Sequence, residues 1–367
     1  MSQSLWGRSL LCRSCAHHVT NTCKQIRPFS SSQTHMQDVP VFKPTSSEKL
    51  DSLLNKFRET VFIPASLTQR HQRLIYRDKY AGKLQQQPVF VNVGRDGSEK
   101  FQLRHLDFQK SPRTTEFREV VRLLKTREDW YAFTPFLSGL RASKRKLEPQ
   151  HWEWVIRQAS RAGMQDLALK WAVQSKHTGL TLKYPGVARQ MFQSFFEKGL
   201  AADFKGEEVV YALKLAKQAA MLLNAPEHTW AIEKEDPKRQ PFTIGVLLEL
   251  AAARAIDAFE GKDEEGDVNL YTTVLMANWR LGTTAAPKDK DVFLANSRLL
   301  ELLPMWHGLK LAMQIEDIKT NQHLWRNLAM RLNELEQSID AIVERVKRED
   351  VSSNLAGLRL CEQLYHK

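Results

Sequence analysis

From Ser111 to the C-terminus, the chain keeps one pattern in which apolar residues recur at intervals of three and four. Proline or glycine interrupts this pattern about every fifteen to twenty residues. Apolar residues at such intervals form one face of an α-helix, while proline and glycine mark helix ends. Short helices joined by tight turns form helical hairpins. The sequence therefore predicts a mainly α fold, an α-solenoid of helical hairpins, with residues 111–326 as its repeat-like domain.

The clearest predicted hairpin runs from Pro149 to Gly179, with its turn at Arg161–Met164. A second hairpin is expected from Pro185, with its turn at Gly199, which follows Gly163 by 36 residues. Two-helix units with a period near this length stack as a solenoid. The apolar stripes of the first hairpin consist of Trp152, Val155, Ile156 and Ala159 on its first helix and Leu167, Ala168, Trp171 and Ala172 on its second.

The first hairpin also resembles a known repeat. Its Arg161–Gly163 turn, the small residues Ala168 and Ala172, and the closing Thr178–Leu180 resemble a pentatricopeptide repeat, a PPR- or TPR-like helical hairpin. The resemblance covers about two units, residues 149–217, and the second unit departs from the pattern near its start. No base-reading positions are therefore carried over. The resemblance implies an α-solenoid of the organellar type found on RNA or in mitochondrial ribosomes.

Residues 38–110 are expected to form a basic N-terminal arm with helices and a β-hairpin. One helix is predicted to begin after Ser47 as its N-cap, and a strongly basic one is predicted from Ser66 to Tyr80. Pro88–Val93 and Lys100–Leu106 alternate apolar and polar residues, and a glycine-containing turn separates them. This is the pattern of two strands joined as a hairpin.

Positive charge is concentrated in the first half of the chain. Residues 70–146 carry 18 Lys and Arg against 8 Asp and Glu, whereas residues 147–367 carry 28 against 30. Basic side chains neutralise phosphates, so we expect this region to bind RNA; a solvated basic face without a ligand is the alternative. The predicted RNA-binding residues are Arg70, Arg73, Arg77, Lys79, Arg104, Lys110, Arg113, Arg141, Lys144, Arg145 and Lys146.

Residues 1–37 have the composition of a mitochondrial transit peptide, because they contain four basic residues, many Ser and Thr, and no acid before Asp38. A secretory signal is the alternative, but its apolar core would be interrupted by Gly7–Ser9. Cys12, Cys15 and Cys23 lie in this leader. A zinc site there would need a second knuckle, which does not follow. Outside the leader only Cys361 remains, so no disulfide framework is expected.

Residues 327–367 are predicted to form an amphipathic helix with a heptad seam. Such a seam either pairs with a helix of a partner protein or folds back on its own solenoid. Folding back is favoured, because fewer than three heptads are marginal for an autonomous coiled coil. The candidate partner-binding residues are Leu328, Leu332, Leu335, Ile339, Ile342 and Val346.

The sequence carries no motif for catalysis, for a cofactor or for a metal. Phosphate-binding loops, the H-E-x-x-H zinc helix and the G-x-S-x-G nucleophile turn do not occur. The acidic segment Glu260–Asp267 lacks the alternating ligands of a calcium loop. The apolar stretch Ile244–Ala253 is too short to span a membrane and is interrupted by Glu249. A non-enzymatic protein without cofactor, metal or small-molecule substrate is therefore expected.

Together these features favour a structural or accessory component of the mitochondrial ribosome in the matrix. Its basic N-terminal region would bind rRNA, and its helical solenoid would contact mitochondrial ribosomal proteins. One alternative is a factor for maturation or translation of mitochondrial mRNA, although base-by-base recognition requires more than two repeats. The other alternative is an assembly-factor scaffold for an inner-membrane complex, which suits the near-neutral helical region.

Overall fold

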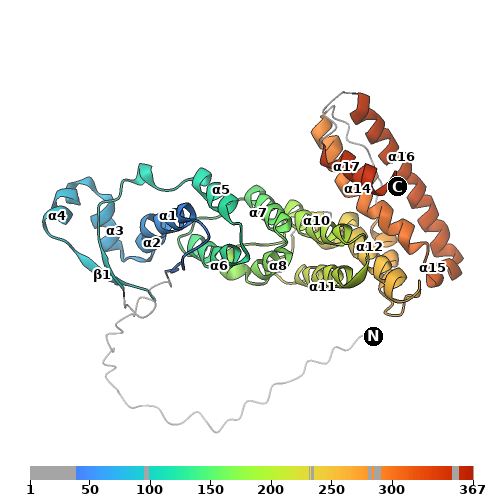
Figure 1. Cartoon of the computed structure of the whole chain (residues 1–367), viewed down its shortest axis with the longest axis horizontal. Helices are drawn as coiled ribbons and strands as arrows, with labels where there is room; N and C mark the ends of the chain where they lie inside the picture. The colour runs from blue at the N-terminus through green and yellow to red at the C-terminus, as the bar shows by residue number, and fades with distance from the viewer. Residues whose placement is uncertain are drawn as a thin grey trace, which may run out of the picture. The chain divides into compact units, whose positions relative to one another are not determined.

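The fold begins with short helices and a β-hairpin, coloured blue to cyan in Figure 1. In this computed structural model the described residues are 39–94, 99–230, 232, 235–279, 283–284, 291–348 and 355–366, without the side chain of Phe108. The predicted transit peptide, with its three cysteines, lies outside them. The first elements are α1 (Glu48–Phe57), η2 (Arg58–Phe62), α2 (Ile63–Ser66), α3 (Gln69–Tyr76), η3 (Asp78–Tyr80), α4 (Ala81–Gln86), β1 (Phe90–Val93), β2 (Glu99–Gln102) and η4 (Phe108–Lys110).

The helix predicted after Ser47 is confirmed as α1, but the long basic helix is wrong in its bounds. Ser66 ends α2, and the N-cap of α3 is Thr68, whose Oγ accepts a hydrogen bond from the His71 amide. Between them Leu67 is buried and has an extended backbone, with φ −72° and ψ 155°. Burying this side chain turns the chain, so the basic segment is divided over several short elements.

The predicted β-hairpin is confirmed. Strands β1 and β2 pair antiparallel, with Val91 opposite Phe101 and Val93 opposite Glu99. Val91 and Val93 are buried, as the alternating pattern requires. The Arg58 guanidinium holds the hairpin on the helices: its Nη1 donates to Glu99 Oε1 at 2.9 Å and its Nη2 pairs with Glu99 Oε2.

The remainder is helical, which confirms the predicted mainly α class. Pro149, Pro185 and Pro241 each begin a helix. Pro135 and Pro304 lie inside helices, so only part of the Pro and Gly pattern marks helix ends. The elements are α5 (Thr114–Leu123), α6 (Arg127–Ala142), α7 (Pro149–Arg161), α8 (Gln165–Val173), α9 (Ser175–Thr178), α10 (Pro185–Ala201), α11 (Gly206–Leu222), η6 (Pro237–Arg239), α12 (Pro241–Ala258), α13 (Asp267–Asn278), α14 (Val292–Ala312), α15 (Glu316–Thr320), α16 (Gln322–Arg348) and α17 (Ala356–Leu364).

The helices from α5 to α11 lie in two rows (Figure 1). Helices α5, α7 and α10 contact one another in chain order, and α6, α8 and α11 do the same. The predicted hairpin of α7 and α8 is confirmed, with Gly163 in the left-handed turn at φ 73°. Its two apolar stripes are buried between the rows. Pairing one helix from each row buries an apolar face on both partners, which stabilises the stack.

The turn expected at Gly199 is not there. Gly199 lies inside α10, and a Cβ added to it would be 2.7 Å from Leu250 Cδ2 of α12. A side chain at this position would require the Leu250 side chain to shift. The chain turns later, where Asp203, Phe204 and Gly206 all have positive φ. The spacing of 36 residues thus joins a turn glycine to a packing glycine and does not measure a repeat.

The heptad seam is buried by its own chain. Leu328, Leu335, Ile339, Ile342 and Val346 are at most 1% exposed, and Leu332 packs against the same core. Helix α16 contacts α14, and Trp306 of α14 donates a hydrogen bond from Nε1 to Glu336 at 3.1 Å. The seam therefore folds back, and its assignment as a surface for a partner helix does not agree with the structure. The boundary predicted at residue 327 falls inside α16.

Candidate nucleic-acid interface

The predicted RNA-binding residues lie on two stretches of the surface. Arg70 and Arg73 are on α3, Arg77 and Lys79 follow it, and Arg104 comes after β2. The later residues lie at η4, at the start of α5, at the end of α6 and in the loop between α6 and α7: these are Lys110, Arg113, Arg141, Lys144, Arg145 and Lys146. All of them except Arg145 are exposed.

The fold brings parts of these two stretches together. The Leu106 amide donates to the Ile75 carbonyl at 2.9 Å, which places the segment after β2 against α3. The His105 ring lies 3.5 Å from the exposed Asp78 carboxylate, so the chain around Arg104 lies close to Arg77 and Lys79. Residues about thirty positions apart in the sequence therefore share one basic surface.

Arg145 differs from the other predicted contacts, because it holds the chain together. Its Nη1 donates to the Pro112 carbonyl at 2.6 Å, and its Nη2 donates to Ser111 Oγ at 2.5 Å. Burial lowers the pKa of the guanidinium, although the group remains charged near neutral pH. Arg145 thus fixes the loop between α6 and α7 against the start of α5, and thereby positions Lys144 and Lys146 beside Lys110 and Arg113.

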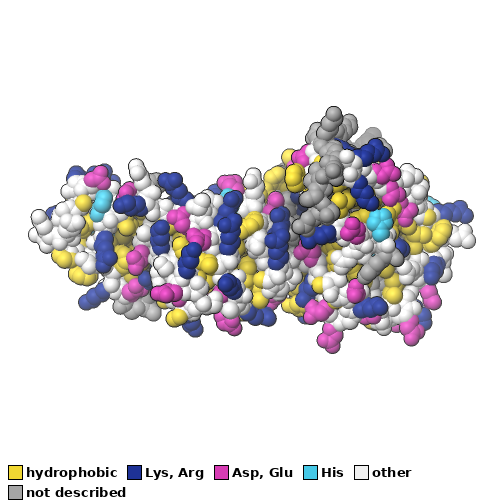
Figure 2. Space-filling view, turned by 45° about the horizontal axis from the view of Figure 1, so that its top comes forward, with side chains coloured by type: hydrophobic (Ala, Val, Ile, Leu, Met, Phe, Trp, Pro, Cys, Tyr) yellow, Lys and Arg dark blue, Asp and Glu magenta, His cyan; other side chains and the backbone are white. Residues whose placement is uncertain are grey.

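The exposed basic residues keep their charge available. Within the described part of the chain, none of the ten exposed predicted residues forms an ion pair with a carboxylate. By contrast, Lys49, Lys56 and Arg58, which lie nearby in the sequence, are paired with Glu119, Glu116 and Glu99. Figure 2 shows Lys and Arg side chains recurring along the surface, with Asp and Glu interspersed. Unpaired cations on a surface favour binding of a polyanion.

A cleft of about 430 Å³ opens beside this loop. Gln72 and Tyr76 of α3 line one wall, and Ser111, Lys144 and Arg145 line the other. No Asp or Glu in the described part of the chain lines it. Tyr76 is 41% exposed, so its ring is available for stacking on an unpaired base. Sequence reasoning noted the basic residues but could not show that α3 and residues 144–145 face one another.

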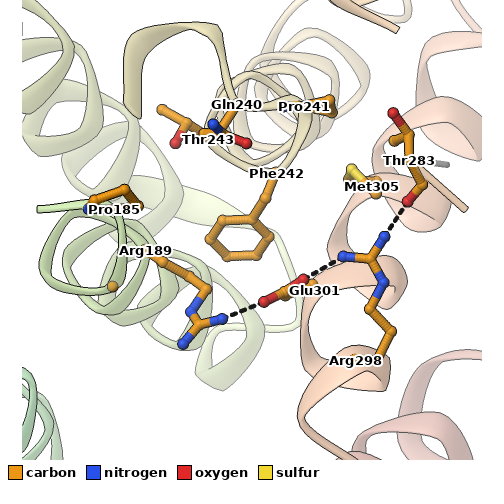
Figure 3. Close-up of a pocket in the computed structure, with 11 residues that line it drawn as sticks. Pro185, Arg189, Gln240, Pro241, Phe242, Thr243, Thr283, Arg298, Glu301 and Met305 are labelled. Carbon is orange, nitrogen blue, oxygen red and sulfur yellow. Dashed lines mark hydrogen bonds and ion pairs between the residues drawn. The ribbon is translucent and has the colours of Figure 1, made fainter. Parts of the chain in front are cut away.

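A second cleft of about 430 Å³ lies between α10, α12 and α14 (Figure 3). Glu301 bridges two arginines there, because its carboxylate oxygens pair with Arg189 and Arg298, and Arg298 also donates to the Thr283 carbonyl. The side chains that line it offer no nucleophile paired with a base. These charges join α10 to α14. No sequence signal joins Arg189 to Glu301, since 112 residues separate them.

Acidic side chains that could suggest a metal are occupied within the protein. In the acidic segment, Asp263 accepts hydrogen bonds from the amides of Val268 and Asn269, and Glu265 pairs with Arg254. Among the described residues, no group of three or more His, Cys, Asp or Glu is arranged to hold a metal ion. In the same part of the chain, no helix combines the length and apolarity that crossing a membrane requires.

One buried acid and one buried base meet between α12 and α14. Glu249 Oε1 lies 2.6 Å from His307 Nδ1, and Glu249 is fully buried. Burial raises the pKa of Glu249 well above its ordinary value, and burial with the Lys310 charge lowers the pKa of His307 to about 4. Burial thus disfavours the charged form of both groups, and their hydrogen bond joins α12 to α14 inside the core.

Comparison with known proteins gives one family. A family model described as "Mitochondrial ribosomal protein mS27" matches residues 27–365. The chain is also similar to "Small ribosomal subunit protein mS27" of Neurospora crassa, with 24% identity over 275 residues. That alignment covers 70% of this chain and 68% of the relative.

Proposed function

The chain belongs to the mitochondrial ribosomal protein mS27 family, and from this membership we propose that it is a subunit of the small mitochondrial ribosomal subunit that binds rRNA. The match over residues 27–365 supports the ribosomal role, because it extends over nearly the whole chain. A ribosomal protein of this family is a structural component of the mitochondrial ribosome and acts in mitochondrial translation without being an enzyme. The family thereby confirms the predicted non-enzymatic ribosomal role.

The rRNA contact is proposed for the basic surface around α3 and the loop between α6 and α7. Its support is the excess of unpaired cations there, their exposure, and the acid-free cleft beside Tyr76. Phosphate contacts of this kind position a protein on RNA without requiring a particular sequence. Arg145 is assigned to positioning the loop, and Arg141, Lys144 and Lys146 are assigned to phosphates.

The paired helices from α5 to α11 are proposed to form a short α-solenoid of PPR-like hairpins that contacts neighbouring ribosomal proteins. Their arrangement in two rows, each with contacts in chain order, supports this. Residues 1–37 are proposed to be a transit peptide that directs the protein to the mitochondrial matrix, on the basis of their basic, acid-free composition.

Gradient fractionation of a mitochondrial lysate that contains the tagged full-length protein tests the proposal. The protein should sediment with the small ribosomal subunit at low salt and be released as salt rises, because counterions compete with phosphate contacts. Migration as a free protein at low salt would contradict it. Crosslinking and RNA sequencing separate the mRNA factor from the ribosomal protein, since the first requires enrichment of mRNA over rRNA.

The scaffold alternative makes a different prediction. It requires that replacing Lys144 and Lys146 by Glu leaves RNA association intact. The ribosomal role predicts that this double substitution weakens it, because two unpaired cations become acids on the proposed contact surface.

A further inference from the structure

Another, smaller cleft is also lined by residues of the basic loop between α6 and α7. It has a volume of about 240 Å³ and is formed by the end of α6, the loop before α7, the end of α9 and the segment before α10. Among the described residues, four cationic side chains and no Asp or Glu line it: these cations are Arg141, Arg145, Lys146 and Lys183. Lys183 comes from a part of the sequence that is not enriched in basic residues, so only the fold joins it to the other three.

Two hydroxyl groups in the cleft form no hydrogen bond to any residue that the structure describes. They belong to Ser175 and Thr181. Thr178 is different, because its hydroxyl donates to the Trp171 carbonyl at 2.7 Å and accepts from the Leu180 amide at 3.3 Å. The cleft therefore offers hydroxyl donors that the protein does not use for its own structure.

The backbone around the cleft is arranged to bring the cations close. Lys144 has a left-handed φ of 60°, and its amide donates to the Arg141 carbonyl at 3.1 Å, which turns the chain at the end of α6. Gly179 has φ 86°, and a Cβ there would be 3.5 Å from Arg141 Cδ. The left-handed turn at Gly179 thus ends α9 where the aliphatic part of Arg141 packs against it.

An aromatic side chain supports the fourth cation. Lys183 Nζ lies 5.0 Å from the centre of the Tyr184 ring, which in turn packs against Trp230 at a centroid distance of 5.5 Å. This contact limits where the ammonium group lies without neutralising its charge. The Lys183 charge therefore remains available to a ligand in the cleft.

We propose that this cleft binds one backbone phosphate of an RNA strand, with Arg141, Lys146 and Lys183 as its cationic contacts and Thr181 and Ser175 as hydroxyl donors. The inference rests on the proposed rRNA contact and names a site within it. A phosphate oxygen accepts charge-assisted hydrogen bonds from several directions, which matches donors supplied from three segments. A metal cation is disfavoured, because no carboxylate lines the cleft.

The test compares three full-length variants in binding to a single-stranded RNA oligonucleotide over a series of salt concentrations. Thr181→Glu adds an acid to the cleft, and Lys183→Glu reverses its fourth cation. Lys214→Glu is the matched control, because Lys214 is exposed on α11 without an ion pair and lies outside the cleft. Both cleft variants should bind RNA about tenfold more weakly and lower the salt slope by about 0.7, whereas the control should resemble wild type.

A thermal melt of each variant establishes that it is folded, and Lys183→Arg should restore binding because it keeps the charge. Cleft variants that bind RNA with wild-type affinity and slope would overturn the site, while rRNA binding elsewhere on the protein would stand. Wild-type protein that binds no RNA at low salt would overturn both proposals. If the cleft variants lost the binding of a polyglutamate peptide that the wild-type protein shows, while their RNA binding was unchanged, the phosphate site would be overturned. The cleft would then be assigned to an acidic protein segment.

Discussion

At the scale of single residues, Asp129 determines how the segment before α1 is held on the helices. This buried carboxylate accepts hydrogen bonds from the amide and hydroxyl of Ser46 at 2.9 and 2.7 Å. It also accepts from the amides of Lys125 and Thr126 at the start of α6. One side chain thus caps a helix and fastens a segment 83 residues away. The sequence does not predict the two bonds from Ser46, because the spacing of Thr126 and Asp129 indicates only a local helix cap.

Asp129→Asn should destabilise the protein by about 2 kcal/mol, since hydrogen bonds to a charged acceptor are lost. Burial alone would raise the pKa of this carboxyl, but the bonds from Ser46, Thr126 and Lys125 lower it to about 2 from an ordinary value of 3.8. A carboxyl with a lowered pKa stabilises the fold above its ordinary pKa, and this stability is lost as pH falls from about 4 toward 2.

Urea denaturation of the wild-type protein and the Asp129→Asn variant at several pH values measures the effect on stability. The difference in the free energy of unfolding between wild type and variant should be largest at pH 6 and should decrease below pH 4. The control is Asp78→Asn, because the Asp78 side chain is 98% exposed and should change stability little at any pH. An Asp129→Asn variant as stable as wild type at pH 6 would contradict the role of this carboxylate.

At the scale of elements, glycines set how closely helices α12 and α14 approach. A Cβ added to Gly308 of α14 would lie 3.0 Å from the Gly245 carbonyl oxygen of α12 and 3.1 Å from Glu249 Cβ. This contact also keeps Glu249 and His307 away from water. The apolar stretch Ile244–Ala253 is visible in the sequence, but the helix against which it packs could not be predicted, since no local pattern identifies that partner.

Gly308→Ala should therefore destabilise the protein by about 1 to 3 kcal/mol, because backbone atoms must move apart. The same substitution at Gly82 of α4 is the control, since nothing lies within 4 Å of a Cβ there. Gly82→Ala should stabilise by about 0.5 to 1 kcal/mol, because alanine favours a helix more than glycine does. Thermal melts should show a lower melting temperature for Gly308→Ala and a higher one for Gly82→Ala. A higher melting temperature for both variants would contradict the prediction, because α12 and α14 could then accommodate the added methyl group.

At the scale of the whole molecule, the sequence predicts the features that follow from residue periodicity or from counts of charged residues. It does not predict features that depend on contacts between residues far apart in the chain. Helical periodicity is enough for the mainly α class, and alternation is enough for the hairpin of β1 and β2. Counting charges locates the basic surface in residues 70–146. The cleft with Lys183 and the bridge from Arg189 to Glu301 could not be predicted, because tertiary packing alone brings those residues together.

The C-terminal helices show the consequence of such packing. Besides the buried seam of α16, helix α17 lies on α14: the Gly357 amide donates to Asn296 Oδ1 at 2.7 Å, and Tyr365 packs against Trp306 at a centroid distance of 4.8 Å. Leu299 and Leu303 of α14 are fully buried in the same core. Helices α16 and α17 therefore complete the core of the helices before them, and do not form an appendage that waits for a partner.

Deleting residues 327–367 should accordingly damage the rest of the protein. Each buried leucine that becomes exposed costs about 1.5 to 3 kcal/mol, so the melting temperature should fall by roughly 10 °C or more and the truncated chain should bind the dye ANS. Met330→Ala is the control within α16, because Met330 is 50% exposed and its loss should leave both measurements unchanged. A truncated chain that melted like wild type and bound no dye would contradict this role. The seam would then be better explained as a surface for another protein.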